Sequence, residues 1–213
     1  MSRAWLYCVM LLAATSGEAA QLDVQVLDRT GRPVEDLVVT LRAPVADRPA
    51  LAAQATMDQI DQRFVPFVLP VRTGTAVVFP NSDSVAHQVY SFSPAKRFEL
   101  GLYRGRPHAP IVFDTPGVIV LGCNIHDRMI GYIYVTDAAE LGKTDAQGAW
   151  TTRSLAAGEY RLEVWSPLFA RDEPKPVQTV KLDDAAPAKV VVRLSRSLRA
   201  APQPQADRNV RDY

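Results

Sequence analysis

Three side chains that bind soft metals occur together in one short stretch of the chain. Cys123, His126 and Met129 offer a thiolate, an imidazole and a thioether within seven residues. Sulfur ligands combined with imidazole suit copper, and the spacing Cys-x2-His-x2-Met can supply all three groups from a single turn. Strand-type sequence precedes this stretch at residues 117–121 and follows it at residues 130–135. We therefore predict a metal-binding loop between two strands.

A candidate for a fourth ligand lies earlier in the chain. Residues 74–79 form another strand-type run, a polar loop follows it, and His87 stands just beyond that loop. Two histidines and one cysteine in a trigonal set, with a weak axial methionine, form the ligand set of blue-copper sites. The predicted ligands of one copper ion are therefore His87, Cys123, His126 and Met129. In this set the methionine would be the axial ligand that tunes the reduction potential.

Other interpretations of these four residues remain open. A buried cysteine, a core methionine and two structural histidines could arise independently of one another. Zinc is disfavoured, because methionine is a poor zinc ligand and structural zinc sites use cysteine and histidine in tetrahedral sets. The third histidine, His108, lies in a Pro- and Arg-rich stretch away from both motifs, where we expect it to be exposed to solvent.

The N-terminus is typical of a bacterial secretory signal. Arg3 precedes an uncharged apolar run over residues 4–14, and Gly17 and Ala19 fit the small-residue positions of a cleavage site. This run is too short to span a bilayer, which takes about 20 residues. We therefore predict a signal peptide over residues 1–19, a periplasmic mature protein and no membrane span.

Cleavage of that signal would change the cysteine count. Cys8 would be removed, and Cys123 would be the only thiol in the mature chain. A lone cysteine in an oxidising compartment cannot form an internal disulfide, so it pairs between chains, stays buried or binds a ligand. This count is an independent indication of a metal at Cys123.

Composition and motifs disfavour several classes of function. The formal net charge of +1 implies no strong attraction to nucleic acid or to a membrane surface. A paired-carboxylate motif, a nucleotide-binding loop and a nucleophile elbow are not recognisable. Two histidines committed to one copper leave too few for a coupled multicopper site. We therefore expect a protein that is not an enzyme.

Strand-type runs and turns dominate the chain, and helical periodicity is scarce. The predicted parts are a signal peptide (1–19), a strand–turn–strand segment (22–43), a copper domain (55–136), a further run of strands (140–195) and a disordered tail (197–213). Within the copper domain, residues 93–110 contain several prolines and glycines and indicate a long irregular excursion.

The two ligand segments resemble those of cupredoxins. Residues 74–87 match Gly-x2-Val-x-Phe-x-Asn-x-Asp-x3-His, and residues 117–135 match Gly-x5-Cys-x2-His-x2-Met-x-Gly-x-Ile-x-Val. The short Cys-to-Met spacing is similar to that of amicyanins. Two departures stand out. Gln88 occupies a position where cupredoxins commonly have asparagine, and Asp127-Arg128 stands where an apolar docking patch is usual. The second departure implies a more electrostatic recognition of partners.

Three shorter sequence segments extend the resemblance. Residues 64–66, 98–103 and 123–127 resemble periplasmic proteins labelled methylamine utilisation proteins, which combine a cupredoxin-like region with a regulatory-like β-sandwich. The outer segments, 22–43 and 140–195, resemble carboxypeptidase-regulatory-like sandwiches. This resemblance implies that residues 22–43 are the first strands of one β-sandwich and residues 140–195 are its remainder, with the copper domain inserted between them. A tandem order of two sandwiches is the open alternative. These resemblances imply an all-β fold, in which a cupredoxin-like Greek-key β-sandwich or barrel is associated with a second small sandwich.

The leading hypothesis for function is a type 1 copper protein that carries single electrons in the periplasm. Its partner would be a redox protein such as a c-type cytochrome or a dehydrogenase. Cys123 would provide electronic coupling, and His126 would be the more exposed imidazole and the electron exit. Two alternatives stay open: copper handling as a chaperone or storage protein, and a metal-free β-sandwich interaction module.

Overall fold

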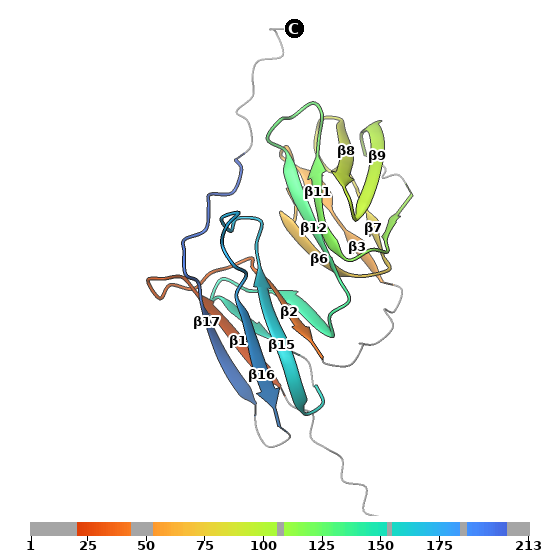
Figure 1. The fold of residues 1–213 in the computed structure, drawn as a ribbon. Helices are drawn as coiled ribbons and strands as arrows, with labels where there is room; N and C mark the ends of the chain where they lie inside the picture. Colours follow the sequence, from red (N-terminus) through yellow and green to blue (C-terminus); the bar gives the residue numbers. More distant parts are fainter. Residues whose placement is uncertain (1–20, 44–52, 106–108, 153–154, 184–186, 204–213) are drawn as a thin grey trace, which may run out of the picture.

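The computed structural model describes residues 21–43, 53–105, 109–152, 155–183 and 187–203. Within these ranges the chain forms 17 β-strands and no helix, which confirms the predicted all-β class (Figure 1). Hence no described helix has the length and apolarity needed to cross a membrane. The predicted signal peptide and His108 lie outside the described residues.

The outer sandwich consists of two sheets built from both ends of the described chain. Their strand orders are β14-β1-β17 and β13-β2-β15-β16. The strands are β1 Leu22–Leu27, β2 Val38–Arg42, β13 Glu140–Lys143, β14 Ala149–Thr151, β15 Gly158–Trp165, β16 Val177–Leu182 and β17 Ala188–Arg193. β1 pairs in parallel with β17 from the opposite end of the chain, so the two outer segments complete one fold.

The inner sandwich is inserted between β2 and β13 and forms a separate body in Figure 1. Its sheets have the orders β10-β7-β3 and β6-β12-β11-β8-β9, and β4 and β5 form a hairpin beside them. The strands are β3 Gln54–Thr56, β4 Asp58–Ile60, β5 Arg63–Val65, β6 Val68–Arg72, β7 Thr75–Val78, β8 His87–Ser93, β9 Lys96–Tyr103, β10 Ile111–Phe113, β11 Gly117–Gly122 and β12 Ile130–Thr136.

The alternation of buried and exposed side chains along β11 shows which face of the strand packs on the core of this sandwich. Successive residues of a strand point to opposite faces, so Ile119 and Leu121 face the core and Val120 faces out. The first two are fully buried, whereas Val120 is 43% exposed. β11 pairs with β12 along its whole length, with Gly122 opposite Ile130. This register brings the two ends of residues 123–129 together.

The prediction of an irregular excursion at residues 93–110 is wrong for most of the described residues in this range. Lys96–Tyr103 is strand β9, which pairs antiparallel with β8 at the edge of the five-stranded sheet. Pro94 falls in the turn before the strand, where its missing N–H does no harm. The ladder is irregular between His87 and Val89, and a bulge of this kind absorbs mismatched residues without ending the strand.

A small apolar cluster joins the two sandwiches. Val38 and Trp165 of the outer sandwich pack with Val68 and Tyr134 of the inner one. The ring centroids of Tyr134 and Trp165 are 4.9 Å apart. Arg42 at the end of β2 also bonds to Asp137, which directly follows β12. The contact between the sandwiches therefore has an apolar centre and an ion pair.

Part of the predicted disordered tail contacts the outer sandwich. Leu198 packs against its core, and the backbone N–H of Arg199 donates to the carbonyl oxygen of Leu168 over 2.9 Å. Leu198 and Arg199 are thus held to the fold, and residues 204–213 lie outside the described part of the chain.

Candidate metal centre

The loop of residues 123–129 connects the neighbouring strands β11 and β12. Its backbone folds through two successive turns, in which the N–H of His126 donates to the Cys123 carbonyl and the N–H of Met129 donates to the His126 carbonyl. The second of these bonds is 2.9 Å long. The turns keep the loop compact, so side chains three residues apart are brought to the same end of the sheet.

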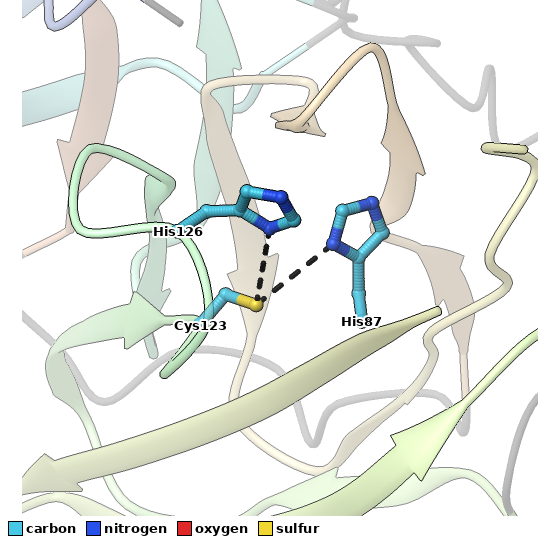
Figure 2. A group of neighbouring side chains, drawn as sticks. All are labelled: His87, Cys123 and His126. Atoms are coloured by element: carbon cyan, nitrogen blue, oxygen red, sulfur yellow. Dashed lines mark hydrogen bonds between the residues drawn. The ribbon is translucent and has the colours of Figure 1, made fainter. Parts of the chain in front are cut away.

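Two imidazole rings converge on the thiol of Cys123 (Figure 2). Its Sγ lies 3.8 Å from Nδ1 of His87 and 3.8 Å from Nδ1 of His126. His87 begins β8, which pairs with β11 on the side opposite β12. Its ring therefore enters the site from a neighbouring strand, whereas the ring of His126 comes from the loop. The three possible ligand atoms all lie within 4.8 Å of one another.

The two sulfur-to-nitrogen separations fit ligands of a common metal ion. Bonds of about 2.1 Å to imidazole nitrogen and about 2.3 Å to thiolate, which are the lengths in zinc sites, place the two donor atoms about 3.8 Å apart when they meet at about 120°. Both sulfur-to-nitrogen distances have this value. The donor set of one thiolate and two imidazoles suits copper. The site can therefore hold a metal ion between its three side chains.

The two imidazoles differ in their access to solvent. His87 is fully buried and Cys123 is buried, whereas His126 is half-buried. Next to it, Ile125 is 54% exposed. His126 is thus the more exposed imidazole, as expected from the sequence.

The surroundings of Cys123 favour its ionised form. Burial raises the pKa of this thiol, but contact with His87 and the backbone amides of Gln88 and Ile125 lower it by more, so the net pKa lies below its usual value. Burial lowers the pKa of His87, whereas its contacts with Cys123 and Asp83 raise it, and the net pKa is above its usual value. A lowered thiol pKa helps metal binding, because the thiolate is the ligand.

Met129 lies next to this cluster. It is buried in the same apolar core as Cys123 and is the last residue before β12. Both residues line a cavity of about 450 Å³, together with Tyr90, Phe92 and Val120. This placement is compatible with an axial role, and Met129 as a ligand stays a prediction.

Asp83 is the residue near the site whose role the sequence analysis missed. Nε2 of His87 bonds to Oδ2 of Asp83 over 2.9 Å, on the side of the ring away from Cys123. The spacing Asp-x3-His was visible in the sequence, but it gives no indication of which way the ring turns. The side chain of Gln88 takes no part, since it bonds to Glu99 on β9.

Comparisons with known proteins give structural matches alone: no family model and no curated protein matches the chain. A Cu-containing nitrite reductase (NirK) from Thermus scotoductus SA-01 is 25% identical, over 45% of this chain and 25% of that chain, with a TM-score of 0.38. A purple cupredoxin from Nitrosopumilus maritimus is 25% identical, over 39% of this chain and 99% of that chain, with a TM-score of 0.32. A reduced amicyanin variant is 18% identical, over 46% of this chain and 99% of that chain, with a TM-score of 0.36. The chain thus spans a quarter of the nitrite reductase that it matches.

Proposed function

We propose that this chain is a periplasmic type 1 copper protein that carries single electrons. The proposed ligands of its one copper ion are His87, Cys123, His126 and Met129. The observation that carries this proposal is the thiol of Cys123, which faces Nδ1 of both imidazoles at 3.8 Å. Copper bound there would supply a one-electron couple between Cu(I) and Cu(II).

The side chains around the site suit such a carrier. His87 starts β8 and Cys123 directly follows β11, so paired neighbouring strands restrict the movement of both. Ligands held in this way limit the change in geometry between the two oxidation states. The burial of His87 and Cys123 also limits the access of water to these two side chains.

The exposed surface next to the site suggests how a partner is recognised. His126 reaches the surface beside Ile125, and the exposed pair Asp127 and Arg128 follows it in the loop. We propose a redox protein as partner, such as a c-type cytochrome or a dehydrogenase. Charges at the rim of such a contact affect the association rate and make it depend on salt. Under this proposal the chain itself is a carrier and not an enzyme.

The proposal is tested on the protein without residues 1–19, loaded with Cu(II). We expect an intense visible charge-transfer band from the thiolate, the small hyperfine splitting of type 1 copper in the EPR spectrum and a reversible one-electron couple. Cys123→Ser is expected to lose the band, whereas Ser91→Ala, a change at a buried position of β8, serves as the matched control.

Two outcomes would contradict this function. A colourless Cu(II) protein with an ordinary EPR spectrum would exclude a type 1 site. Tight Cu(I) binding without a reversible couple, together with fast transfer to an acceptor, would favour copper handling instead. The proposed compartment is tested separately, by recovering the processed chain from the periplasmic fraction of bacteria that express residues 1–213.

A further inference from the structure

The carboxylate of Asp83 lies against the buried end of the His87 ring. Its Oδ2 is 2.9 Å from Nε2 of His87, while Nδ1 of the same ring faces Sγ of Cys123. The Asp83 side chain is 10% exposed and the His87 side chain is fully buried. The imidazole is thus held between a carboxylate on one side and the thiol on the other.

The fold holds this carboxylate in a fixed position. Oδ2 also accepts the backbone N–H of Gln62 over 2.8 Å, and Oδ1 accepts the N–H of Ser84 over 2.7 Å. The N–H of Asp83 donates to Oδ1 of Asn81 over 3.0 Å, and Asn81 is itself buried. The position of Asp83 is therefore set by its own loop and by a second segment of the chain.

The second segment is the turn of the β4–β5 hairpin. Asp61 and Gln62 form this turn with φ values of 49° and 56°, an arrangement that non-glycine residues adopt infrequently. The turn aims the N–H of Gln62 at the carboxylate. The hairpin also bonds to the same loop at a second place, where Oδ2 of Asp58 accepts the hydroxyl of Ser82 over 2.8 Å. The hairpin thus supports the loop that carries His87.

A carboxylate that accepts a hydrogen bond from one ring nitrogen selects the tautomer of a histidine. An ionised carboxylate can only accept, so Nε2 of His87 must carry the proton of that bond. The lone pair of the neutral ring is then on Nδ1, which points toward Cys123. In metal sites a partner of this kind fixes the orientation of the ring and raises the basicity of the ligand.

We propose that Asp83 is a positioning residue for the metal site, which fixes the tautomer and orientation of His87 and thereby strengthens Cu(II) binding over Cu(I) binding. This inference rests on the proposed copper function and extends it to a residue outside the ligand set. A more basic imidazole favours the more highly charged ion. Asp83 is therefore expected to hold the reduction potential below the value that the ligands alone would set.

The test compares Asp83→Asn with Asp127→Asn. Each change removes one negative charge near one of the two histidines, and Asp127 is exposed in the ligand loop. Asparagine at residue 83 has nearly the same size as aspartate. Both carboxylate oxygens of Asp83 accept hydrogen bonds, so the NH2 group of asparagine would face an N–H group with which it cannot bond. We expect Cu(II) affinity to fall by about 10- to 100-fold in Asp83→Asn, with a much smaller change in Cu(I) affinity. Each tenfold selective loss of Cu(II) binding raises the potential by about 59 mV.

A measurement on the unmutated protein keeps the inference testable if Asp83→Asn folds poorly. In the Cu(I)-loaded protein, long-range proton–nitrogen NMR spectra are expected to show His87 protonated at Nε2, with a slowly exchanging proton. Rapid exchange of that proton would overturn the inference, because it would show that the bond to Asp83 does not form.

The outcomes separate this inference from the proposed function. A wild-type protein without the thiolate-to-copper band contradicts the function, whatever the variants do. A wild-type protein with the band, combined with equal affinities and potentials in Asp83→Asn and Asp127→Asn, contradicts only the role of Asp83. A selective loss of Cu(II) binding in Asp83→Asn supports both.

Discussion

Phe64 occupies the space that a side chain at residue 131 would need. A Cβ added to Gly131 would lie 2.6 Å from Cβ and 3.0 Å from Cγ of Phe64. Phe64 is buried on β5, and Gly131 follows the ligand loop on β12. The missing side chain at residue 131 therefore lets the β4–β5 hairpin pack closely on the strand that leaves the metal site.

Gly131→Ala is expected to destabilise the protein. The methyl group would overlap the base of a buried ring, which cannot move away as the free end of a side chain can, and overpacking of this kind costs about 1–3 kcal/mol. The control is Gly101→Ala on β9, where an added Cβ meets no atom within 4 Å. Urea unfolding of the metal-free protein compares the two. Equal stabilities of the two variants would contradict the close packing of Phe64 on Gly131.

Met129→Leu tests the axial ligand. Leucine has a similar volume, so the free energy of unfolding of the metal-free protein is expected to change by less than about 1.5 kcal/mol. A type 1 site without its axial thioether keeps the thiolate band, because this band belongs to Cys123, but its reduction potential changes. We expect a higher potential, since the lost sulfur donor stabilises Cu(II). An unchanged potential measured by voltammetry would show that Met129 is a core residue and not a ligand.

The ligand loop could be predicted from sequence because its signals are local. Cys123, His126 and Met129 lie close together, and the strands on either side show clear apolar patterns. The loop connects two strands that pair with each other, so residues close together in the sequence determine most of its geometry. His87 was found in the same way, from the strand-type run and polar loop before it.

Features that depend on distant pairing could not be predicted from local pattern. Pro94 and Gly101 indicated irregular structure, yet pairing with β8 makes residues 96–103 a strand. The bond between Asp83 and His87 needs the ring orientation, which depends partly on Gln62, 21 residues away from Asp83. The pairing of β1 with β17 joins segments at opposite ends of the chain. In each case the deciding contact is remote in sequence.

Tyr103 is expected to make stability fall at high pH. Burial raises its pKa to about 12 from the usual value of 10.0, against the lowering effect of the bond from Gln59. The folded protein therefore holds this phenolic proton more tightly than the unfolded chain does. Its contribution to stability is complete below pH 10 and is lost as pH rises from 10 to 12. Absorbance titration of the phenolate, together with urea unfolding across this range, checks the expectation.

Tyr103→Phe is the matched variant for this titration. The hydroxyl of Tyr103 donates to the carbonyl oxygen of Phe79 over 2.6 Å and accepts from Nε2 of Gln59, which is fully buried. Loss of both bonds leaves buried polar groups with fewer partners, at a cost of about 1–3 kcal/mol near neutral pH. Tyr90→Phe, at a half-buried tyrosine on β8, is the control. If Tyr103→Phe kept the wild-type decline above pH 10, the decline would not come from Tyr103.

The ion pair of Arg42 and Asp137 is expected to give a small stabilisation that disappears in acid. The hydrogen bond from Arg42 and its charge hold the pKa of Asp137 below 3.8, against the opposing effect of burial. A carboxyl whose pKa is lowered by folding stabilises the protein above its unfolded pKa, and this contribution is lost as pH falls through the folded pKa. Because the two side chains are 35% and 62% exposed, the pair should contribute less than about 1 kcal/mol.

A double-mutant cycle with Arg42→Gln and Asp137→Asn isolates this contribution. Arg42 also donates to the Thr136 hydroxyl over 3.1 Å, so the single Arg42→Gln variant should lose more stability than the coupling energy alone. Urea unfolding at pH 7 is expected to show a positive coupling that shrinks near pH 3 and in 1 M salt, where charges are screened over about 3 Å. A coupling that persisted in acid would assign the contact to packing between β2 and the segment after β12. A coupling that vanishes there would show that an ion pair helps to hold the inner sandwich to the outer one.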